Sequence, residues 1–316
     1  CTRPYDSTSQ GHVCMTLIAL KIDVDTYRGT REGVPPLLRA LDHAQAGATF
    51  LFSLGPDHTG RAIRRVFRPG FFGKVSRTSV VEHYGLRTLL YGTLLPGPDI
   101  ARREAATLRA VAQAGFETGV HTWDHVRWQD GVTTANPAWT RRELQRATDR
   151  YAEVFGTPAR VHGAAGWQMN EAAYRLEAEL GYTLASDGRG THPFVPVDAS
   201  GQVLGPLQLP TTLPTLDELI GLDGWDPSNV HRALLDRTEQ DTSPLHVYTL
   251  HAELEGQKLL PVFERLLQGW RDQGHTLVSL GQAAATLATQ AVPRCHIATG
   301  TVPGRSGELA VQGAEF

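Results

Sequence analysis

Cysteine is scarce in this sequence, which limits how the chain can be cross-linked and which metal sites it can build. The 316 residues include three cysteines, Cys1, Cys14 and Cys295, and no two of them have C-x-x-C spacing. An odd number of cysteines without that spacing predicts neither a disulfide framework nor a zinc site made of thiolates. We therefore expect a protein of a reducing, cytoplasmic compartment.

A strong charge of either sign is also missing. The 30 Lys and Arg residues nearly balance the 33 Asp and Glu residues, so the formal net charge is -3. This balance argues against nucleic acid as a general partner. A chain of this length with 41% hydrophobic residues can bury a sizeable core as an ordinary globular protein.

Long apolar runs are the third absence. No run reaches the roughly 18 residues that a membrane-spanning helix needs, and the N-terminus lacks the basic and then apolar profile of a signal peptide. We therefore expect the chain not to cross a membrane. Because Met15 resembles a more natural start, residues 1–14 are expected to be a non-native or disordered extension. The alternative is a processed lipoprotein that begins at Cys1.

What the sequence does contain is an alternation of apolar strands and amphipathic helices. A strand over 17–22, a helix carrying Leu37, Leu38 and Leu41, and a strand over 48–52 form a βαβ unit, hence a parallel sheet. At least six such alternations favour a closed or nearly closed (β/α) barrel, and no G-x-G-x-x-G turn follows the first strand, as a dinucleotide-binding sheet would require. Further helices are expected over 99–114, 140–155, 170–180 and 260–273, and further strands over 116–120, 160–162, 182–185, 246–250 and 276–280.

Two aspartates end the first expected strand. Side chains alternate between the faces of a strand, so Asp23 and Asp25 project to one side and Val24 to the other. Two carboxylates so close together favour either a metal between them or different protonation roles. The plain alternative is a solvated strand end with an Asp turn.

A pair of histidines follows the strand expected over 116–120. His121 and His125 are four residues apart, and on a helical turn they would lie on one face about 6 Å apart, able to bind one cation. In a chain with 13 histidines such a pair also arises by chance, so it is weak alone. Asp187, His251 and Glu253 follow other strands, however, and the chemistry of barrels sits at the carboxyl ends of strands.

Five ordered motifs carry a resemblance to a known family. They are Ile-Asp-Val-Asp over 22–25, His-Thr-Trp-Asp-His over 121–125, Gly-Ala-Ala-Gly-Trp over 163–167, Ser-Asp-Gly-Arg-Gly over 186–190, and Tyr-Thr-Leu-His-Ala-Glu over 248–253. The set resembles the NodB-type polysaccharide deacetylases and, more narrowly, the 4-deoxy-4-formamido-L-arabinose-phosphoundecaprenol deformylases. The likeness extends from about Leu17 to Gly307. It implies a distorted (β/α)7 barrel over 15–290, followed by a tail over 291–316, that binds one divalent metal and hydrolyses an N-acyl group of an amino sugar.

The resemblance also implies roles for individual residues. Asp23 would be the general base and His251 the general acid, while Asp25, His121 and His125 would hold the metal, most simply zinc, with cobalt, nickel or manganese as alternatives. Asp187 and Arg189 would orient the base or the acid, and the backbone around Ala165 and Gly166 would donate to the oxyanion. The residues assigned to substrate are Arg28, Trp123, Trp167 and Glu253.

The sequence departs from the general deacetylases in two places. Val24 splits the usual adjacent aspartates, and residues 163–166 lack the usual Arg and Pro. The first departure leaves open which aspartate is the ligand, although the shared face favours Asp25. The second leaves open how the base is oriented.

A basic segment interrupts the alternation over 55–98. Between Asp57 and Glu82 it has no acidic residue, and its basic side chains are interleaved with apolar ones, among them Phe67, Phe71 and Phe72. We interpret it as a helical insert that docks on an anionic membrane through about 58–81, which suits a lipid-linked amino sugar as substrate. The alternative is a solvated helical pair over the barrel mouth. The basic residues are Arg61, Arg64, Arg65, Arg68, Lys74 and Arg77.

Other functions stay open from sequence alone. A related amidase could act on a polysaccharide, on peptidoglycan or on an amide without a sugar. A metal-binding module without catalysis, or an iron oxygenase with two histidines and one carboxylate, is a further alternative. Asp23 and His251 count against these last two, because neither needs a base and an acid beside the metal. Nothing in the sequence indicates an oligomeric state.

Overall fold

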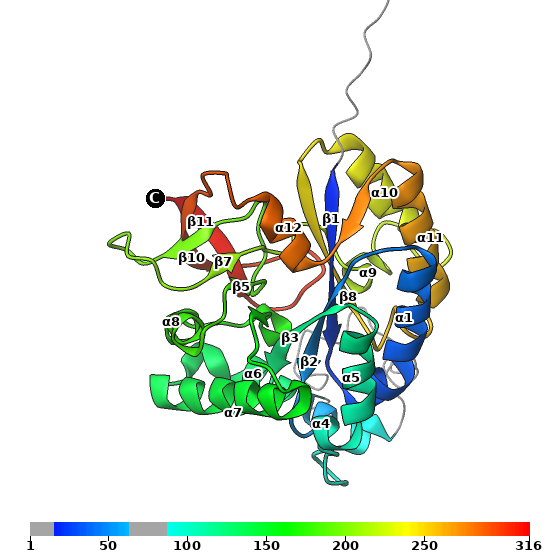
Figure 1. The fold of residues 1–316 in the computed structure, drawn as a ribbon. Helices are drawn as coiled ribbons and strands as arrows, with labels where there is room; N and C mark the ends of the chain where they lie inside the picture. The colour runs from blue at the N-terminus through cyan, green and yellow to red at the C-terminus, as the bar shows by residue number, and fades with distance from the viewer. Residues whose placement is uncertain (1–15, 63–86) are drawn as a thin grey trace, which may run out of the picture.

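The centre of the computed structural model, which describes residues 16–62 and 87–316, is a parallel sheet (Figure 1). Its order is β7-β5-β4-β3-β2-β1-β8, with β9 paired to the start of β1. The N–H groups of Thr212 and Leu213, after β7, donate to the carbonyl of Val247 in β8 at 3.1 and 3.2 Å. The two edges therefore meet, and the predicted distorted barrel is confirmed. The strands are β1 (Leu17–Val24), β2 (Thr49–Ser53), β3 (Glu117–Thr122), β4 (Val161–His162), β5 (Leu184–Ala185), β7 (Leu207–Gln208), β8 (Leu245–His251) and β9 (Thr276–Val278).

Helices cover the outside of this sheet. The helix expected over 99–114 is two helices, because Glu104 leaves the helical region with φ -115° and ψ 21°. Single turns of other helix types occur at Gly29–Gly33, Thr59–Ala62, Thr88–Leu90, Val132–Thr134 and Ala165–Trp167. The helices are α1 (Val34–His43), α4 (Ile100–Arg103), α5 (Ala105–Gln113), α6 (His125–Gly131), α7 (Pro137–Phe155), α8 (Glu171–Leu180), α9 (Leu216–Leu219), α10 (His231–Gln240), α11 (Leu260–Asp272) and α12 (Leu280–Thr286).

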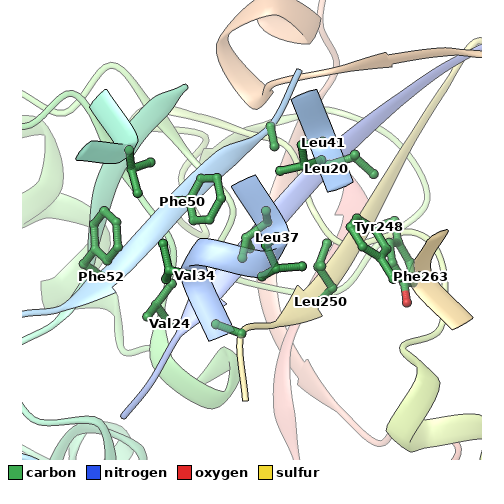
Figure 2. Close-up of a cluster of buried hydrophobic side chains, with 14 of the residues drawn as sticks. Leu20, Val24, Val34, Leu37, Leu41, Phe50, Phe52, Tyr248, Leu250 and Phe263 are labelled. Atoms are coloured by element: carbon green, nitrogen blue, oxygen red, sulfur yellow. The ribbon is translucent and has the colours of Figure 1, made fainter. Parts of the chain in front are cut away.

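The largest core lies between the sheet and its helices. Figure 2 shows Leu20 and Val24 of β1 and Phe50 of β2 facing Leu37 of α1, with Phe263 of α11 beside β8. All five side chains are fully buried. Full burial of a side chain of this size stabilises the fold by about 1.5–3 kcal/mol, so this layer fixes the register of the strands that carry the site.

The opposite face of β1 points into the barrel and changes from apolar to polar along the strand. Ala19 belongs to an interior apolar cluster with Leu51 and Val247, whereas the next inward residues are Lys21 and Asp23. Strand alternation places all three β1 residues on one face. The barrel is therefore closed by apolar side chains near the amino ends of its strands and lined by ionisable groups at their carboxyl ends.

The C-terminal residues form a second, smaller sheet. β10 (Arg294–Gly300) pairs antiparallel with β11 (Leu309–Glu315) and parallel with β6 (Val195–Val197). Arg189 donates its N–H to the carbonyl of Ala310 and accepts from the N–H of Gln312. The segment expected to be a tail thus packs against the loop that follows β5. The β6 strand is too short for its periodicity to predict this pairing.

Two sequence expectations fall on residues outside the described part of the chain. These are the extension over 1–14 and most of the basic insert, because only its flanks up to residue 62 and from residue 87 are described. Of its named basic residues, only Arg61 lies within the described ranges. Among the helices described, none has the length and apolar character needed to cross a membrane.

Candidate active site

Asp25 lies just beyond β1, and its backbone is held by a buried glutamate. The N–H groups of Asp25 and Thr26 donate to Oε1 of Glu253 at 3.0 and 2.8 Å, and the Thr26 hydroxyl donates to the same oxygen. Burial, together with the nearby Asp25 carboxylate, raises the pKa of Glu253 to about 8. Oε1 of Glu253 therefore holds the backbone at Asp25 and Thr26, while Oε2 has no hydrogen-bond partner among the described residues.

His121 and His125 both face Asp25, but they are not on one helical turn as expected. His121 is on β3 and His125 begins α6, whose N-cap is Asp124. The strand therefore ends inside the motif, and the short turn that follows folds His125 back toward His121. Their ring centroids are 5.4 Å apart. The predicted convergence is present, although its backbone geometry is different.

The three side chains fit a divalent cation. Nε2 of His121 lies 3.1 Å from Oδ1 of Asp25, and Nε2 of His125 lies 3.4 Å from Oδ2. Ligands of a tetrahedral zinc ion lie about 3.4 Å apart, given bond lengths near 2.1 Å. Asp25 Oδ1 is buried and accepts no well-directed hydrogen bond from any described residue. Burial opposes its ionisation, but His125 and His121 together hold the pKa of Asp25 well below its usual range.

A backbone carbonyl sets the orientation of His121. Its Nδ1 donates to the carbonyl oxygen of Gly163 at 2.6 Å, so Nε2 is the nitrogen that faces Asp25. A hydrogen bond of this kind fixes the tautomer of a metal-ligating histidine.

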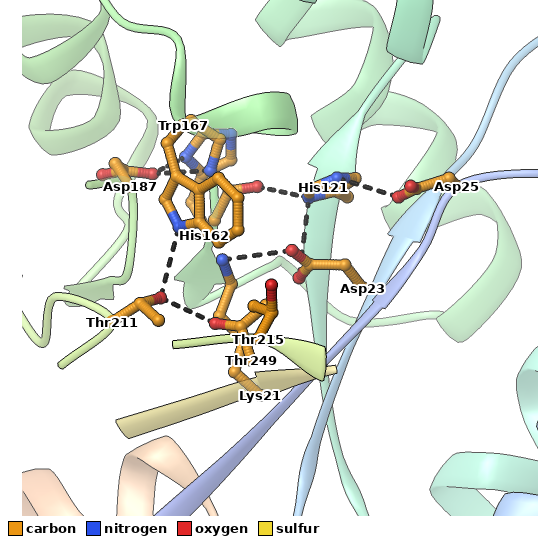
Figure 3. A network of polar contacts seen from close by, with 12 residues as sticks. Lys21, Asp23, Asp25, His121, His162, Trp167, Asp187, Thr211, Thr215 and Thr249 are labelled. Carbon is orange, nitrogen blue, oxygen red and sulfur yellow. Dashed lines mark hydrogen bonds and ion pairs between the residues drawn. The ribbon is translucent and has the colours of Figure 1, made fainter. Parts of the chain in front are cut away.

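Asp23 lies beside these residues inside the barrel (Figure 3). Its Oδ2 is 3.2 Å from Nζ of Lys21, and its Oδ1 is 3.9 Å from Nδ1 of His121. Asp23 is 3% exposed, and Oδ1 has no hydrogen-bond partner among the described residues. The carboxylate therefore has one oxygen paired with a cation and one oxygen turned toward the candidate metal ligands.

His251 reaches the same region from the neighbouring strand. In the β1–β8 pairing its Cα is opposite that of Asp23. The N–H of His251 donates to Glu255, and its ring meets that of Trp167 edge to face. Burial alone would lower the pKa of His251, but Asp217, Asp25 and further carboxylates outweigh it and raise that pKa. His251 is therefore well suited to hold a proton.

Asp187 lies in a separate buried cluster. One of its oxygens accepts from Nδ1 of His162 at 2.8 Å and from the N–H of Ala164 at 2.9 Å, and the other accepts from Gln208. Glu177 also lies 2.6 Å from Nδ1 of His162. Asp187 thus fixes the start of the loop whose Gly163 carbonyl orients His121, and it reaches Asp23 and His251 only through other residues.

The loop that contains Ala165 and Gly166 has an unusual backbone. Gly166 and Trp167 have φ of 60° and 51°, a left-handed conformation that is strained for tryptophan. The N–H groups of Ala165 and Gly166 donate to no other residue in the described part of the chain. Trp167 is almost fully buried, and its indole N–H donates to Thr211. Both N–H groups are therefore able to donate to a bound molecule.

The remaining predicted residues, Arg189, Trp123 and Arg28, contact other side chains. The guanidinium of Arg189 packs over Trp167 and is paired with Glu218. The ring of Trp123 is covered by Arg146 and Arg150 of α7. Arg28 is at the surface, where it pairs with Glu32.

Three side chains of the site were not predicted from the sequence. Lys21 is fully buried against Asp23, Glu255 accepts from the N–H of His251, and Arg305 of the C-terminal segment packs on Trp167. For Lys21 the sequence does contain a signal, a lysine on the barrel face of an otherwise apolar strand. The pairing of Arg305 with Asp217 has no sequence signal, because the two segments meet only in the fold.

The family described as "Polysaccharide deacetylase" matches residues 15–185. That stretch includes β1 and β3, with Asp23, Asp25, His121 and His125, and it ends before Asp187 and His251.

Two curated proteins are similar over most of the chain. Both are named "Probable 4-deoxy-4-formamido-L-arabinose-phosphoundecaprenol deformylase", one from Shewanella sediminis and one from Wigglesworthia glossinidia brevipalpis. The first is 38% identical over 80% of this chain and 81% of its own, and the second is 31% identical over 90% and 98%. A crystal structure of a "putative polysaccharide deacetylase from Mycobacterium smegmatis" superposes with a TM-score of 0.62, covering 95% of this chain and 99% of the other at 19% identity. At this identity, the likeness to the crystal structure shows a shared fold only.

Proposed function

Because the chain belongs to the polysaccharide deacetylase family, we propose that it is a metal-dependent hydrolase that removes the N-formyl group from a lipid-linked amino sugar. The observation that carries this proposal is the meeting of Asp25, His121 and His125 beside Asp23 and His251, in a chain 38% identical to a relative named a deformylase of such a lipid.

Asp25, His121 and His125 would hold the metal, for which zinc is the simplest choice. Two imidazoles and one carboxylate leave a coordination position open, as catalytic rather than structural zinc sites do. A divalent cation in such a site polarises an amide carbonyl and acidifies a water molecule. The remaining chemistry belongs to the side chains around it.

Asp23 would take a proton from the attacking water, because its Oδ1 faces the ligands and has no described hydrogen-bond partner. His251 would give a proton to the departing amine nitrogen, which is a poor leaving group until it is protonated. The charge on the carbonyl oxygen would be met by the N–H groups of Ala165 and Gly166. The ring of Trp167 lies next to both Nζ of Lys21 and the ring of His251.

The decisive experiment is incubation of the purified, zinc-loaded protein with a formylated 4-amino-4-deoxyarabinose lipid, with released formate as the readout. We expect stoichiometric formate and a free amine. The same lipid with an N-acetyl group, and a soluble chitooligosaccharide, test the alternative of a general deacetylase. Release of acetate from either one without formate from the first lipid would replace the proposed substrate and keep the amide hydrolysis.

We further propose that the protein works at the cytoplasmic face of the membrane, held there by the basic insert. The support is the composition of residues 58–81, whose basic side chains are interleaved with apolar ones. Flotation with liposomes that contain anionic lipid tests this, with liposomes of neutral lipid as the control. Flotation with neither composition, or equal flotation with both, would remove the membrane part of the proposal.

A further inference from the structure

Lys21 is the most unusual side chain of the barrel interior. It is fully buried, although lysine is among the residue types that are almost never buried unless paired. Its Nζ has one carboxylate within ion-pair distance among the described residues, Oδ2 of Asp23 at 3.2 Å. A buried ammonium without a strong compensating contact is expensive, so this pair is retained at a cost to stability.

We propose that Lys21 is the positioning residue for Asp23, an inference that rests on the proposed function of that carboxylate as the base. Lys21 and Asp23 are two residues apart on β1 and so share its inner face. The ammonium attracts Oδ2, and this leaves Oδ1 as the oxygen directed toward His121 (Figure 3). One oxygen of the base is thereby held while the other is free to accept a proton.

The surrounding residues are shaped to let the lysine reach this position. A Cβ at Gly163 would lie 3.0 Å from Cε of Lys21 and 2.3 Å from a methyl of Leu51, so the glycine makes room for the lysine stem. The ammonium also lies 5.4 Å from the ring centroid of Trp167, where the electron-rich face of the indole stabilises it. This cation supplies an orientation that the sequence had left open, since residues 163–166 contain no arginine.

The main test compares Lys21→Met with Lys21→Arg in zinc-loaded protein that hydrolyses the formylated lipid. We expect Lys21→Met to lower kcat about 100-fold, the cost of a misplaced catalytic group, while KM changes less than about threefold and the zinc content stays at the parental value. Lys21→Arg keeps the positive charge and should restore kcat to within about tenfold of the parent. Lys258→Met is the matched control at an exposed lysine and should leave kcat unchanged.

The background of Asp23→Asn separates positioning from a general packing effect. If Lys21 acts through Asp23, adding Lys21→Met to Asp23→Asn lowers kcat less than about threefold further. A loss as large as in the parental background would overturn the proposal, as would parental kcat in Lys21→Met. Lys21→Arg as inactive as Lys21→Met, with both variants folded and loaded with zinc, would also overturn it.

Thermal unfolding of the metal-free protein tests the pair without any substrate. Lys21→Met and Asp23→Asn each leave one buried charge unpaired and should lower Tm, whereas the double variant should lower Tm by less than the sum. Additive shifts would overturn the pairing. If the parent protein releases no formate but the shifts are non-additive, the proposed substrate fails and the pairing of Lys21 with Asp23 stands.

Discussion

At the scale of single residues, the clearest division is between side chains that would hold the metal and those that would move protons. Asp23→Asn removes an oxygen that can take a proton but leaves Asp25, His121 and His125 in place. We expect this variant to bind zinc as the parent does and to lose about 10²–10⁴-fold in kcat. His125→Ala should lose both zinc and turnover. Atomic absorption and formate release measure the two quantities, and equal zinc loss in both variants would exchange the roles of Asp23 and Asp25.

The buried cluster of His162, Glu177 and Asp187 gives a prediction for pH dependence. Burial opposes the charge on His162, but Asp187 and Glu177 outweigh it and raise the pKa of His162 to about 10. The ordinary value is about 6.5, so the folded protein binds this proton more tightly than the unfolded chain does. The stabilisation is complete below about pH 6.5 and is lost as the pH rises toward 10. Burial also raises the pKa of Glu177, and a raised carboxyl pKa acts in the same direction.

We therefore expect Tm to fall as the pH rises from 6.5 to 9.5, with a loss of stability on the order of 3 kcal/mol from this cluster. His162→Asn should be less stable than the parent at pH 6.5, and its Tm should change less with pH, because the titrating imidazole is absent. Differential scanning calorimetry of the two proteins across this range measures the difference in slope. Parallel pH profiles would show that His162 does not carry the effect.

The site was predictable from sequence where its residues lie at strand ends and unpredictable where the fold brings them together. Asp25 and His121 follow apolar strands, and parallel strands bring such ends to one edge. Trp123 sits in the same motif as His121, yet its ring packs under α7, because a motif does not show on which side of the chain a side chain emerges. Arg305 meets Trp167 only through the C-terminal hairpin, which has no local signal.

At the scale of elements, the loop after β4 connects the buried cluster to the candidate metal ligands. Gly163 accepts a hydrogen bond from His121, and Ala164 donates one to Asp187. A Cβ at Gly163 would approach Leu51 to 2.3 Å, so the loop would have to shift away from both β2 and Lys21.

Gly163→Ala should therefore lower stability by about 1–3 kcal/mol, as overpacking does, and lower kcat by more than the loss of folded protein accounts for. Gly115→Ala is the control, because its φ of 86° makes it costly while no atom lies within 4 Å of the added Cβ. That variant should lose stability, by about 1 kcal/mol, and keep its kcat. Urea unfolding and formate release distinguish the two. If Gly163→Ala and Gly115→Ala have the same kcat, the loop after β4 does not position the residues of the site.

The elements themselves were predicted best where periodicity runs long. α7 and α11 were expected within a few residues of their bounds, because each carries an uninterrupted apolar stripe. β6 and β7 have three and two residues and were not expected, because strands so short hold no measurable alternation. Their pairing depends on neighbours far along the chain.

At the scale of the whole molecule, binding of the proposed metal should raise the stability of the folded barrel. A ligand that binds only the folded state stabilises it by about 2.7 kcal/mol at a free concentration of 100 times Kd. For a chain of 316 residues, that corresponds to a rise in Tm of roughly 4 °C. We expect this rise when zinc is returned to protein stripped with a chelator, and we expect His125→Ala to show none of it.

The second group of histidine and carboxylates makes this prediction specific. His162, Glu177 and Asp187 also lie close enough together to suggest a metal site. Nδ1 of His162 is only 2.6 and 2.8 Å from the two carboxylate oxygens, however, which are hydrogen-bond distances and leave no room for a cation between the same atoms. His162→Asn should therefore keep the zinc-dependent rise in Tm that His125→Ala loses. A rise that is lost in His162→Asn and kept in His125→Ala would move the metal to the buried cluster and remove Asp25, His121 and His125 as its ligands.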